Sequence, residues 1–279
     1  MLRLRRAVRP LTQTDRDAAL ALCAEDLTSS VFVAARILEN PRSITQVLGF
    51  EGDRGLEALC WTCANVMPVA ADSAALAAFA HRLGRGRQRH ASLLGPRPTV
   101  VELWSQLETA WGPARTIRGH QPLLETRTPP SVLGVAADDR VRRARPGDVD
   151  RVLPAAVHMF THEIGYRPFS GSSRSYRDSL RSLIDRGHTW IVVEDGAVVF
   201  KADVGSAALG WVQLQGVWMA PWLRGQGYAV PMLAAVLDQL FAEGVAAVTL
   251  YVNDFNTPAL AAYRHLGFTE VGEFATVLL

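Results

Sequence analysis

The segment best suited to chemistry contains two glycines, Gly225 and Gly227, between a strand-like run and an amphipathic helix-like run. It reads Val217-Trp-Met-Ala-Pro-Trp-Leu-Arg-Gly-Gln-Gly-Tyr-Ala229. The first N–H groups of a helix have no partner inside the helix, and the helix dipole places partial positive charge there. Glycines remove the side chains that would block a close approach to these groups. The segment therefore predicts an anion site that can hold a pyrophosphate.

The run after the glycines predicts a helix with one apolar face. Pro231 fits the first turn of this helix, and Gly244 supplies its end. An ordinary strand-to-helix turn can need two glycines as well, so the loop alone does not decide the function. The apolar residues recur at helical spacing: Val230, Leu233, Val236, Leu237, Leu240 and Phe241.

A second segment, Asn256-Thr-Pro-Ala-Leu-Ala-Ala-Tyr-Arg-His-Leu-Gly-Phe268, predicts a capped helix and its exit. Thr257 is expected to cap this helix and Pro258 to occupy its first turn. A strand is expected immediately before it, from Val245 to Val252.

The two segments together resemble the GNAT superfamily of N-acetyltransferases. Arg224-x-x-Gly227-x-Ala229 matches the family signature Arg/Gln-x-x-Gly-x-Gly/Ala. The second segment matches Asn-x-x-Ala-x-x-x-Tyr-x-x-x-Gly-Phe at all five named positions. The resemblance covers about half of the chain. It implies acetyl-CoA as co-substrate, no metal, and transfer of the acetyl group to a primary amine by direct attack on the thioester.

The resemblance also implies which residues contact the coenzyme. In the family, main-chain groups of the strand before the loop pair with the pantetheine arm, and one N–H points at the thioester oxygen. A contact between Asn256 and the coenzyme is expected from the same resemblance, with helix capping as the alternative role of Asn256. The matching strand and loop positions are Val217, Trp218, Met219, Arg224, Gly225, Gln226, Gly227, Tyr228 and Ala229.

Two residues are expected to take part in proton transfer. Tyr263 stands where the family places a tyrosine near the coenzyme sulfur, so it could protonate the leaving thiolate; a buried tyrosine packed on Phe268 is the alternative. Many family members carry a glutamate on the strand before the loop, but this chain has Gln213, and an amide cannot act as a base. Glu163 is therefore the candidate for acceptor binding or water-mediated deprotonation, with a solvated loop carboxylate as the alternative. His158 and His162 are weaker candidates.

The two halves of the chain open alike, which suggests a divergent internal duplication. Leu2-Arg-Leu-Arg-Arg and Val141-Arg-Arg-Ala-Arg are each expected to form a short strand that precedes a polar break and a helix. A linker is expected at residues 128–139 because Thr-Pro-Pro-Ser disfavours regular structure. We therefore expect domains at 1–135 and 139–279. The predicted fold is α/β of the α+β type, with two GNAT-like domains, each a mixed, mostly antiparallel sheet flanked by helices.

The element pattern of the second half predicts helices at 149–160 and 175–186, a hairpin around Asp195-Gly196, and a strand at 211–219. In the first half, helices are expected at 15–23, 30–38 and 73–83, with strands within 46–69. Where the first half should carry its glycine loop, the sequence is Met67-Pro-Val-Ala-Ala-Asp-Ser73. The first half is therefore interpreted as a degenerate GNAT-like domain that binds no coenzyme.

The composition excludes several other classes. Hydrophobic residues make up 49% and charged residues 20% of the 279 residues, which is typical of a folded soluble protein, and the net charge is only +2. No run resembles a signal peptide or a membrane span, so a cytoplasmic location without membrane contact is expected. Arginines between Arg82 and Arg89 could touch nucleic acid, but without interleaved aromatics a solvated loop is favoured. Cys60 and Cys63 are interpreted as reduced strand cysteines rather than half of a metal site.

The acceptor is not specified by the sequence. A small-molecule amine and a peptide or protein amine both remain open, and so does the formation of a homodimer. The alternative to an enzyme is a non-catalytic acyl-CoA-binding regulatory protein, in which the loop persists without the chemistry.

Overall fold

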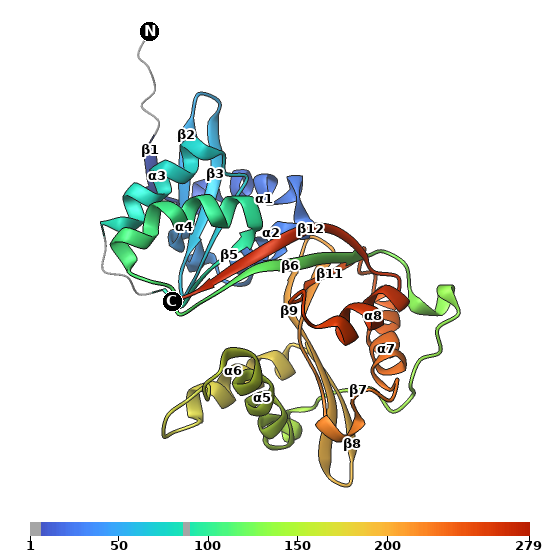
Figure 1. Cartoon of the computed structure of the whole chain (residues 1–279). Helices are drawn as coiled ribbons and strands as arrows, with labels where there is room; N and C mark the ends of the chain where they lie inside the picture. Colours follow the sequence, from blue (N-terminus) through green and yellow to red (C-terminus); the bar gives the residue numbers. More distant parts are fainter. Residues whose placement is uncertain (1–6, 86–89) are drawn as a thin grey trace. The chain divides into compact units, whose positions relative to one another are not determined.

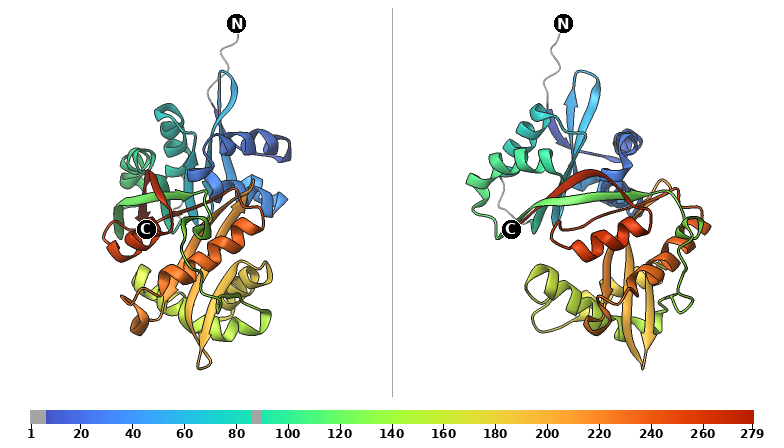
Figure 2. Two further views of the ribbon diagram at one scale, coloured as in Figure 1. Left: turned by 90° about the vertical axis from the view of Figure 1, so that its right-hand side faces the viewer. Right: turned by 45° about the vertical axis from the view of Figure 1, so that its right-hand side comes forward.

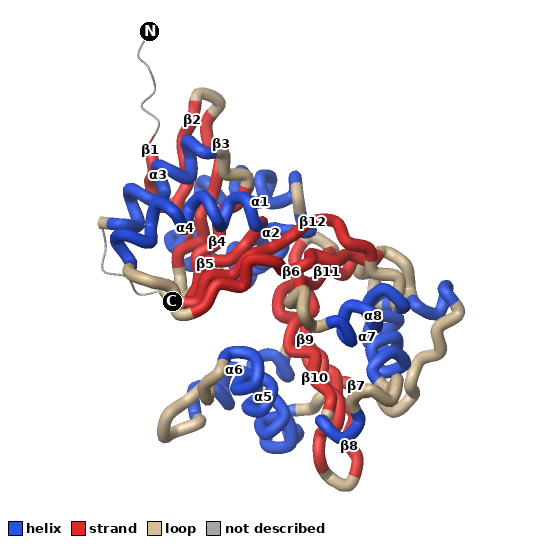
Figure 3. Tube along the Cα trace, in the orientation of Figure 1, coloured by secondary structure: helices blue, strands red, loops and turns tan. Residues whose placement is uncertain are grey.

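The computed structural model describes residues 7–85 and 90–279, which form two compact units (Figures 1 and 3). The first unit contains the described residues up to Leu124, together with Tyr251–Phe255 and Glu270–Leu279. The second contains Glu125–Leu250 and Asn256–Thr269. These bounds differ from the expected domains 1–135 and 139–279, because residues 125–135 belong to the second unit and the last strand of the chain belongs to the first.

The first unit is a mixed sheet with helices on both faces (Figure 2). The helices α1 (Arg16–Glu25) and α2 (Leu27–Glu39) cover one face, and α3 (Ser73–Gly84) and α4 (Arg97–Trp111) cover the other. Its strands follow the spatial order β1 (Ala7–Pro10), β2 (Val47–Gly52), β3 (Gly55–Thr62), β4 (Asn65–Val69), β5 (Ser92–Pro96), β12 (Thr269–Leu278) and β6 (Thr116–Thr126).

The strand β12 completes the sheet of the first unit, although it comes from the end of the chain. It pairs antiparallel with β5, from Phe274 opposite Pro96 to Leu278 opposite Ser92. The buried Thr276 hydroxyl also donates a hydrogen bond to Gln121 Oε1 at 2.7 Å. No element was predicted from the sequence at 269–278, nor at β5, α4 or β6.

The second unit repeats this architecture (Figure 1). The helices α5 (Val149–Ile164) and α6 (Arg174–Asp185) cover one face of its sheet, and α7 (Ala229–Ala242) and α8 (Thr257–His265) cover the other. Within this sheet β10 and β11 pair in parallel, and the pairs β9–β10, β8–β9 and β7–β8 are antiparallel. The predicted mixed, mostly antiparallel sheets flanked by helices are thereby confirmed. The strand order is β11 (Ala247–Tyr251), β10 (Trp211–Met219), β9 (Ala197–Ala208), β8 (Thr189–Glu194) and β7 (Arg142–Arg143).

The two halves of the chain, β1 to β6 and β7 to β12, share one order of elements: a short strand, a 3₁₀ turn, two helices, three strands, then helix, strand, helix, strand. They also share an ion pair. Arg9 binds Asp15, six positions further along the chain, at 2.7 Å, and Arg142 binds Asp148, also six positions further along, at 2.7 Å. Each aspartate also accepts a backbone N–H at the start of its 3₁₀ turn. This repetition supports the internal duplication suggested by the sequence, although residues 2–6 lie outside the described range.

Several local expectations need correction. The helix α5 continues to Ile164 because Gly165, with φ of +88°, ends it and donates its N–H to the Thr161 carbonyl. Arg82 belongs to α3 rather than to a loop, and Arg87 and Arg89 lie outside the described residues. Cys60 is buried in β3 as expected, but Cys63 follows the strand and is exposed. The hairpin at Asp195-Gly196 is confirmed, with both residues at positive φ.

Among residues 7–85 and 90–279, no helix has the length and apolar character needed to cross a membrane. In the same ranges, no cluster of three histidine, cysteine or acidic side chains is arranged to bind a metal ion.

Candidate active site

The strands β10 and β11 separate along their length. Their parallel register runs from Trp211 opposite Ala247 to Gln213 opposite Thr249, whereas β10 continues to Met219. On its other edge β10 stays paired with β9 as far as Met219. The described register therefore pairs no residue of β10 beyond Gln213 with β11. On the edge of β10 that faces β11, the backbone donors and acceptors of Val217–Met219 can therefore bind an extended ligand.

The loop after β10 has the backbone that its glycines permit. Gly225 has φ of +73° and Gly227 has φ of +84°, a region that other L-residues rarely adopt. A Cβ atom added at either glycine would meet no described atom within 4 Å. Both glycines are exposed, so one face of the loop is open to a ligand.

Two loop side chains brace the loop. Arg224 Nε donates a hydrogen bond to the Met219 carbonyl at 3.0 Å, which ties the loop back to β10. Gln226 Nε2 donates to the Trp222 carbonyl at 2.7 Å. The sequence predicted that Arg224 and Gln226 contact the coenzyme, and that contact stays a prediction. Their bonds within the chain explain how the loop keeps its shape.

The N-terminus of α7 has no side-chain cap. Tyr228 precedes the helix without capping it, and Pro231 in the first turn has no N–H to leave unpaired. The equivalent helix of the first unit, α3, differs in this respect. Its N-cap Asp72 accepts a hydrogen bond from the Ala75 N–H at 2.8 Å. The positive end of α7 is thus open, whereas that of α3 holds a carboxylate of its own chain.

Trp218 of β10 is buried against α5. Its indole Nε1 donates to His158 Nδ1 at 3.1 Å, and the two rings meet edge to face with centroids 5.7 Å apart. Since the indole can only donate, His158 Nδ1 is an acceptor here. His158 also stacks on His162, with centroids 6.4 Å apart. His158 therefore holds Trp218 in place, which fits the structural role expected for it.

Tyr263 lies on α8 with 6% of its surface exposed. Its ring meets Phe268 edge to face at a centroid distance of 5.6 Å, so the packing expected as the alternative role is present. Burial raises the pKa of the phenol above its usual value, and the negative charge of Glu163 raises this pKa further. Tyr263 consequently keeps its proton at neutral pH. The two predicted catalytic residues lie close enough for one to affect the other's titration.

Glu163 is exposed in the last turn of α5 and does not lie in a loop. Its charge also acts on Tyr176 of α6. Burial, then the charge of Asp203, then that of Glu163 raise the pKa of Tyr176 to about 12. The Tyr176 hydroxyl donates to the Ala156 carbonyl at 3.1 Å. Glu163, at the end of α5, thus raises the pKa of two tyrosines, and both keep their protons at neutral pH.

Asn256 is the N-cap of α8, because its side-chain oxygen accepts a hydrogen bond from the Ala259 N–H at 3.3 Å. The expectation that Thr257 caps this helix is wrong; Thr257 is its first residue. The predicted contact of Asn256 with the coenzyme stays a prediction. Gln213 is 6% exposed, and its Nε2 has no hydrogen-bond partner among the described residues.

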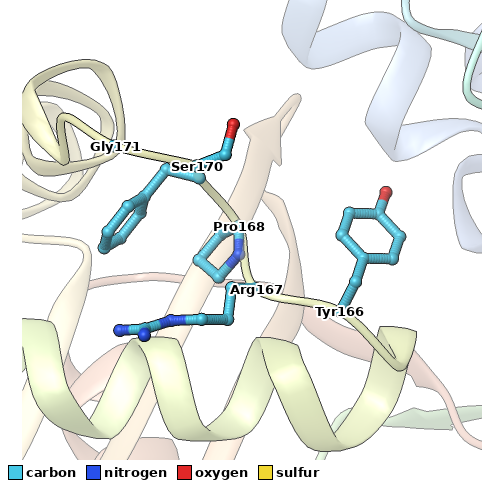
Figure 4. Close-up of a pocket in the computed structure, with 6 residues that line it drawn as sticks. Tyr166, Arg167, Pro168, Ser170 and Gly171 are labelled. Atoms are coloured by element: carbon cyan, nitrogen blue, oxygen red, sulfur yellow. The ribbon is translucent and has the colours of Figure 1, made fainter.

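An open pocket of about 710 Å³ follows α5 (Figure 4). Its lining is one continuous stretch, Tyr166–Gly171, in which Arg167 extends over the Phe169 ring at 5.8 Å. Tyr166 and Arg167 point in different directions in Figure 4. This stretch was not predicted as a pocket from the sequence, although Gly165, Pro168 and Gly171 with interleaved aromatics indicate a shaped loop.

Comparison with known families agrees with this geometry. Residues 157–268 match the model of the acetyltransferase (GNAT) family. These residues form a GNAT-family acetyltransferase domain. Residues 45–152 match a domain of unknown function, DUF4081.

Individual proteins extend the comparison. The mycothiol acetyltransferase of Clavibacter sepedonicus is 30% identical over 147 residues, which cover 47% of this chain and 48% of that protein. The chain thus spans about half or less of the curated relatives that it matches. A GCN5-related N-acetyltransferase from Sphaerobacter thermophilus aligns over 99% of this chain and 96% of its own, with a TM-score of 0.63 and 15% identity. A tandem GNAT protein from the clavulanic acid biosynthesis pathway aligns over 98% of both chains, with a TM-score of 0.56 and 13% identity. The fold of the whole chain is therefore that of a tandem GNAT protein.

Proposed function

We propose that the second unit transfers an acetyl group from acetyl-CoA to a primary amine. The observation that carries this proposal is the continuous path from the unpaired edge of β10, through the glycine loop, to the uncapped start of α7. An extended thioester arm fits beside the strand, and a pyrophosphate fits at the helix N-terminus. Family membership of residues 157–268 supports the same co-substrate.

Within this proposal, β10 and the glycine loop bind different parts of the coenzyme. Main-chain groups of Val217, Trp218 and Met219 bind the pantetheine arm, and one of their N–H groups polarises the thioester carbonyl. Such a preorganised donor contributes about 3 kcal/mol to transition-state stabilisation. The N–H groups of Gly225–Ala229 bind the pyrophosphate, while Arg224 keeps the loop attached to the strand.

The acceptor amine attacks the thioester carbonyl carbon, forming the C–N bond as the C–S bond breaks. The thiolate takes a proton from the Tyr263 hydroxyl, which its raised pKa keeps available at neutral pH. Before the attack, the ammonium form of the acceptor gives one proton to Glu163 through water; an amine of pKa about 10.4 needs this step, because at neutral pH it is mostly protonated. After the C–N bond forms, the nitrogen gives up a second proton, which passes through water to the Tyr263 oxygen and restores the phenol.

The acceptor is proposed to enter beside the stretch Tyr166–Gly171, which follows Glu163 directly and lines the open pocket. The curated relatives that match this chain include mycothiol acetyltransferases. The amine precursor of mycothiol is therefore the first acceptor to test, followed by small amines and peptides.

The experiment is an acetyl-CoA turnover assay over this panel, with release of free thiol as the readout. Turnover with at least one amine is expected, and Glu163→Gln should raise KM for that amine or lower kcat without changing the affinity for acetyl-CoA. Binding of acetyl-CoA without turnover of any amine would instead favour a non-catalytic acyl-CoA-binding protein. Failure to bind acetyl-CoA in calorimetry would contradict both functions.

A further inference from the structure

The only lysine of the chain, Lys201, is buried in the second unit and has no part in the mechanism above. It lies on β9 with 1% of its surface exposed, and Asp203, two residues further along the strand, is 3% exposed. Side chains two residues apart in a strand point to the same face. The Lys201 ammonium and the Asp203 carboxylate form an ion pair there.

Each partner of this ion pair makes one further hydrogen bond. Lys201 Nζ donates a hydrogen bond to the Gly216 carbonyl at 3.2 Å, and Asp203 Oδ1 accepts one from the Thr189 hydroxyl at 2.8 Å. Replacing a buried ion pair by apolar residues of similar volume often leaves a protein as stable or more stable. Stability alone is therefore a poor explanation for placing the only lysine here.

Gly216 sits where β10 departs from regular pairing. The register between β9 and β10 shifts between Gln215 and Trp218, which is the signature of a bulge. Gly216 has φ of +60°, and a Cβ atom there would lie 2.9 Å from both Lys201 Nζ and Asp203 Oδ2. The glycine thus lets the strand backbone approach the ion pair closely.

The bulge consists of Gly216 and Val217, between the paired residues Gln215 and Trp218, and so lies at the start of Val217–Met219, the stretch proposed to bind the thioester arm. A bulge re-aims the residues that follow it. The direction of the Val217–Met219 main-chain groups therefore depends on how the Gly216 peptide is held, and Lys201 is the side chain that holds its carbonyl.

We propose that Lys201 is a positioning residue for the coenzyme-binding strand, with Asp203 as the counterion that keeps the ammonium in place. Lys201 fixes the Gly216 carbonyl and thereby aims the backbone of Val217–Met219 at the thioester. This inference rests on the proposed function, because it assigns Lys201 to the same site. It involves no contact between Lys201 and the substrate.

The decisive variant is the double substitution Lys201→Met/Asp203→Leu, which removes both charges and keeps the volume. A folded protein is expected, as checked by urea unfolding, for the reason given above. Its kcat with acetyl-CoA should fall about 100-fold, since a misplacement of about 1 Å can cost that much. A purely structural ion pair would leave kcat and KM of a folded double variant unchanged, and that result would overturn the proposal.

Two further variants serve as a control and as a second test of the same hydrogen bond. Arg142→Met breaks another ion pair of the second unit, that with the buried Asp148, and should lower stability without changing kcat. Gly216→Ala tests the same hydrogen bond by a change in β10. The added Cβ separates the Lys201 ammonium from the Gly216 carbonyl without removing a charge. If the double variant does not fold, wild-type kcat in a folded Gly216→Ala protein overturns the proposal. Absence of turnover in the wild type would contradict the proposed function, whereas wild-type kcat in these variants contradicts only the role of Lys201.

Discussion

At the scale of single residues, Tyr263 has an observed packing contact and a proposed role as proton donor, which the sequence could not separate. The ring packs against Phe268, and the hydroxyl belongs to a phenol whose pKa burial and Glu163 raise. A raised pKa makes the phenol a weaker acid, but it also keeps the proton in place over the whole neutral range. Packing and proton donation are therefore compatible in one side chain.

Tyr263→Phe removes the hydroxyl and keeps the packing. If Tyr263 is the general acid, kcat should fall about 100- to 10,000-fold, with little change in the affinity for acetyl-CoA. Because the pKa of Tyr263 lies above its usual value of about 10, loss of its proton should not lower the wild-type rate between about pH 7 and 9. Steady-state kinetics across this pH range provide the measurement.

Tyr176→Phe is the matched control, because Tyr176 is a half-buried phenol on which the charge of Glu163 also acts, with its pKa raised to about 12. Its hydroxyl bonds the Ala156 carbonyl, so the change should affect stability more than kcat. Wild-type turnover in Tyr263→Phe, under conditions where chemistry limits the rate, would leave the thiolate to take its proton from solvent.

At the scale of the elements, the strand–loop–helix unit depends on backbone conformations that only glycine adopts easily. Gly227→Val adds a branched side chain at φ of +84°. The strain is about 1–2 kcal/mol, and the side chain occupies the open face of the loop. Affinity for acetyl-CoA in calorimetry should fall at least tenfold.

Gly244→Val controls for the strain. Gly244 follows the other end of α7 with φ of +89°, and a Cβ atom there also meets no described atom within 4 Å. The two variants should lose comparable stability, but Gly244→Val should keep the wild-type affinity for acetyl-CoA. Equal affinities in both folded variants would remove the loop from the coenzyme site.

The start of α5 depends on Asp148, which is buried and accepts hydrogen bonds from Arg142, Arg151 and the Arg145 N–H. Hydrogen bonding to Arg142 is the largest cause that holds the pKa of this carboxyl below its usual range. The folded pKa is depressed, so the stabilisation is complete above the unfolded pKa of about 3.9 and is lost as the pH falls below it.

Asp148→Asn should therefore lower the free energy of unfolding by about 2 kcal/mol at pH 7, as expected for hydrogen bonds to a charged group. The difference between wild type and variant should shrink as the pH falls below about 4. Urea unfolding at several pH values measures both. A difference that stays constant down to pH 2 would show that charge is not the source of the stabilisation.

At the scale of the whole molecule, the two halves of the chain share one order of elements but differ at the helix that follows the third long strand. In the second unit α7 begins with an open N-terminus after two glycines. In the first unit α3 begins with Asp72, whose carboxylate occupies the position where an anion would bind. A phosphate there would meet both a negative charge and an N–H that already has a partner.

One acetyl-CoA should consequently bind per chain. Calorimetry should give a stoichiometry of one, and Gly227→Val should weaken that single site. Asp72→Ala removes the cap and should lower stability by about 1 kcal/mol without changing the stoichiometry. A second site of similar affinity, mapped to the first unit by hydrogen exchange, would contradict this interpretation.

Much of the fold follows from local sequence. The Asp195-Gly196 hairpin, the strand 211–219 and the end of α7 before Gly244 were predictable because backbone conformation and hydrophobic period depend on neighbouring residues. The glycine loop and the segment around Tyr263 were recognisable for the same reason, since each is a short continuous motif.

Only the tertiary structure decided the remaining features, because they depend on pairing between segments that local patterns do not connect. The strand β12 joins β5 of the first unit, and no period in 269–278 names that partner. Glu163 acts on Tyr263 only because α5 and α8 belong to one unit. The contact of Lys201 with the Gly216 carbonyl arises from the register of β9 and β10 and its bulge. Strand register is set by the packing of whole faces, so the sequence determined the parts of the site and the folded chain determined which of them meet.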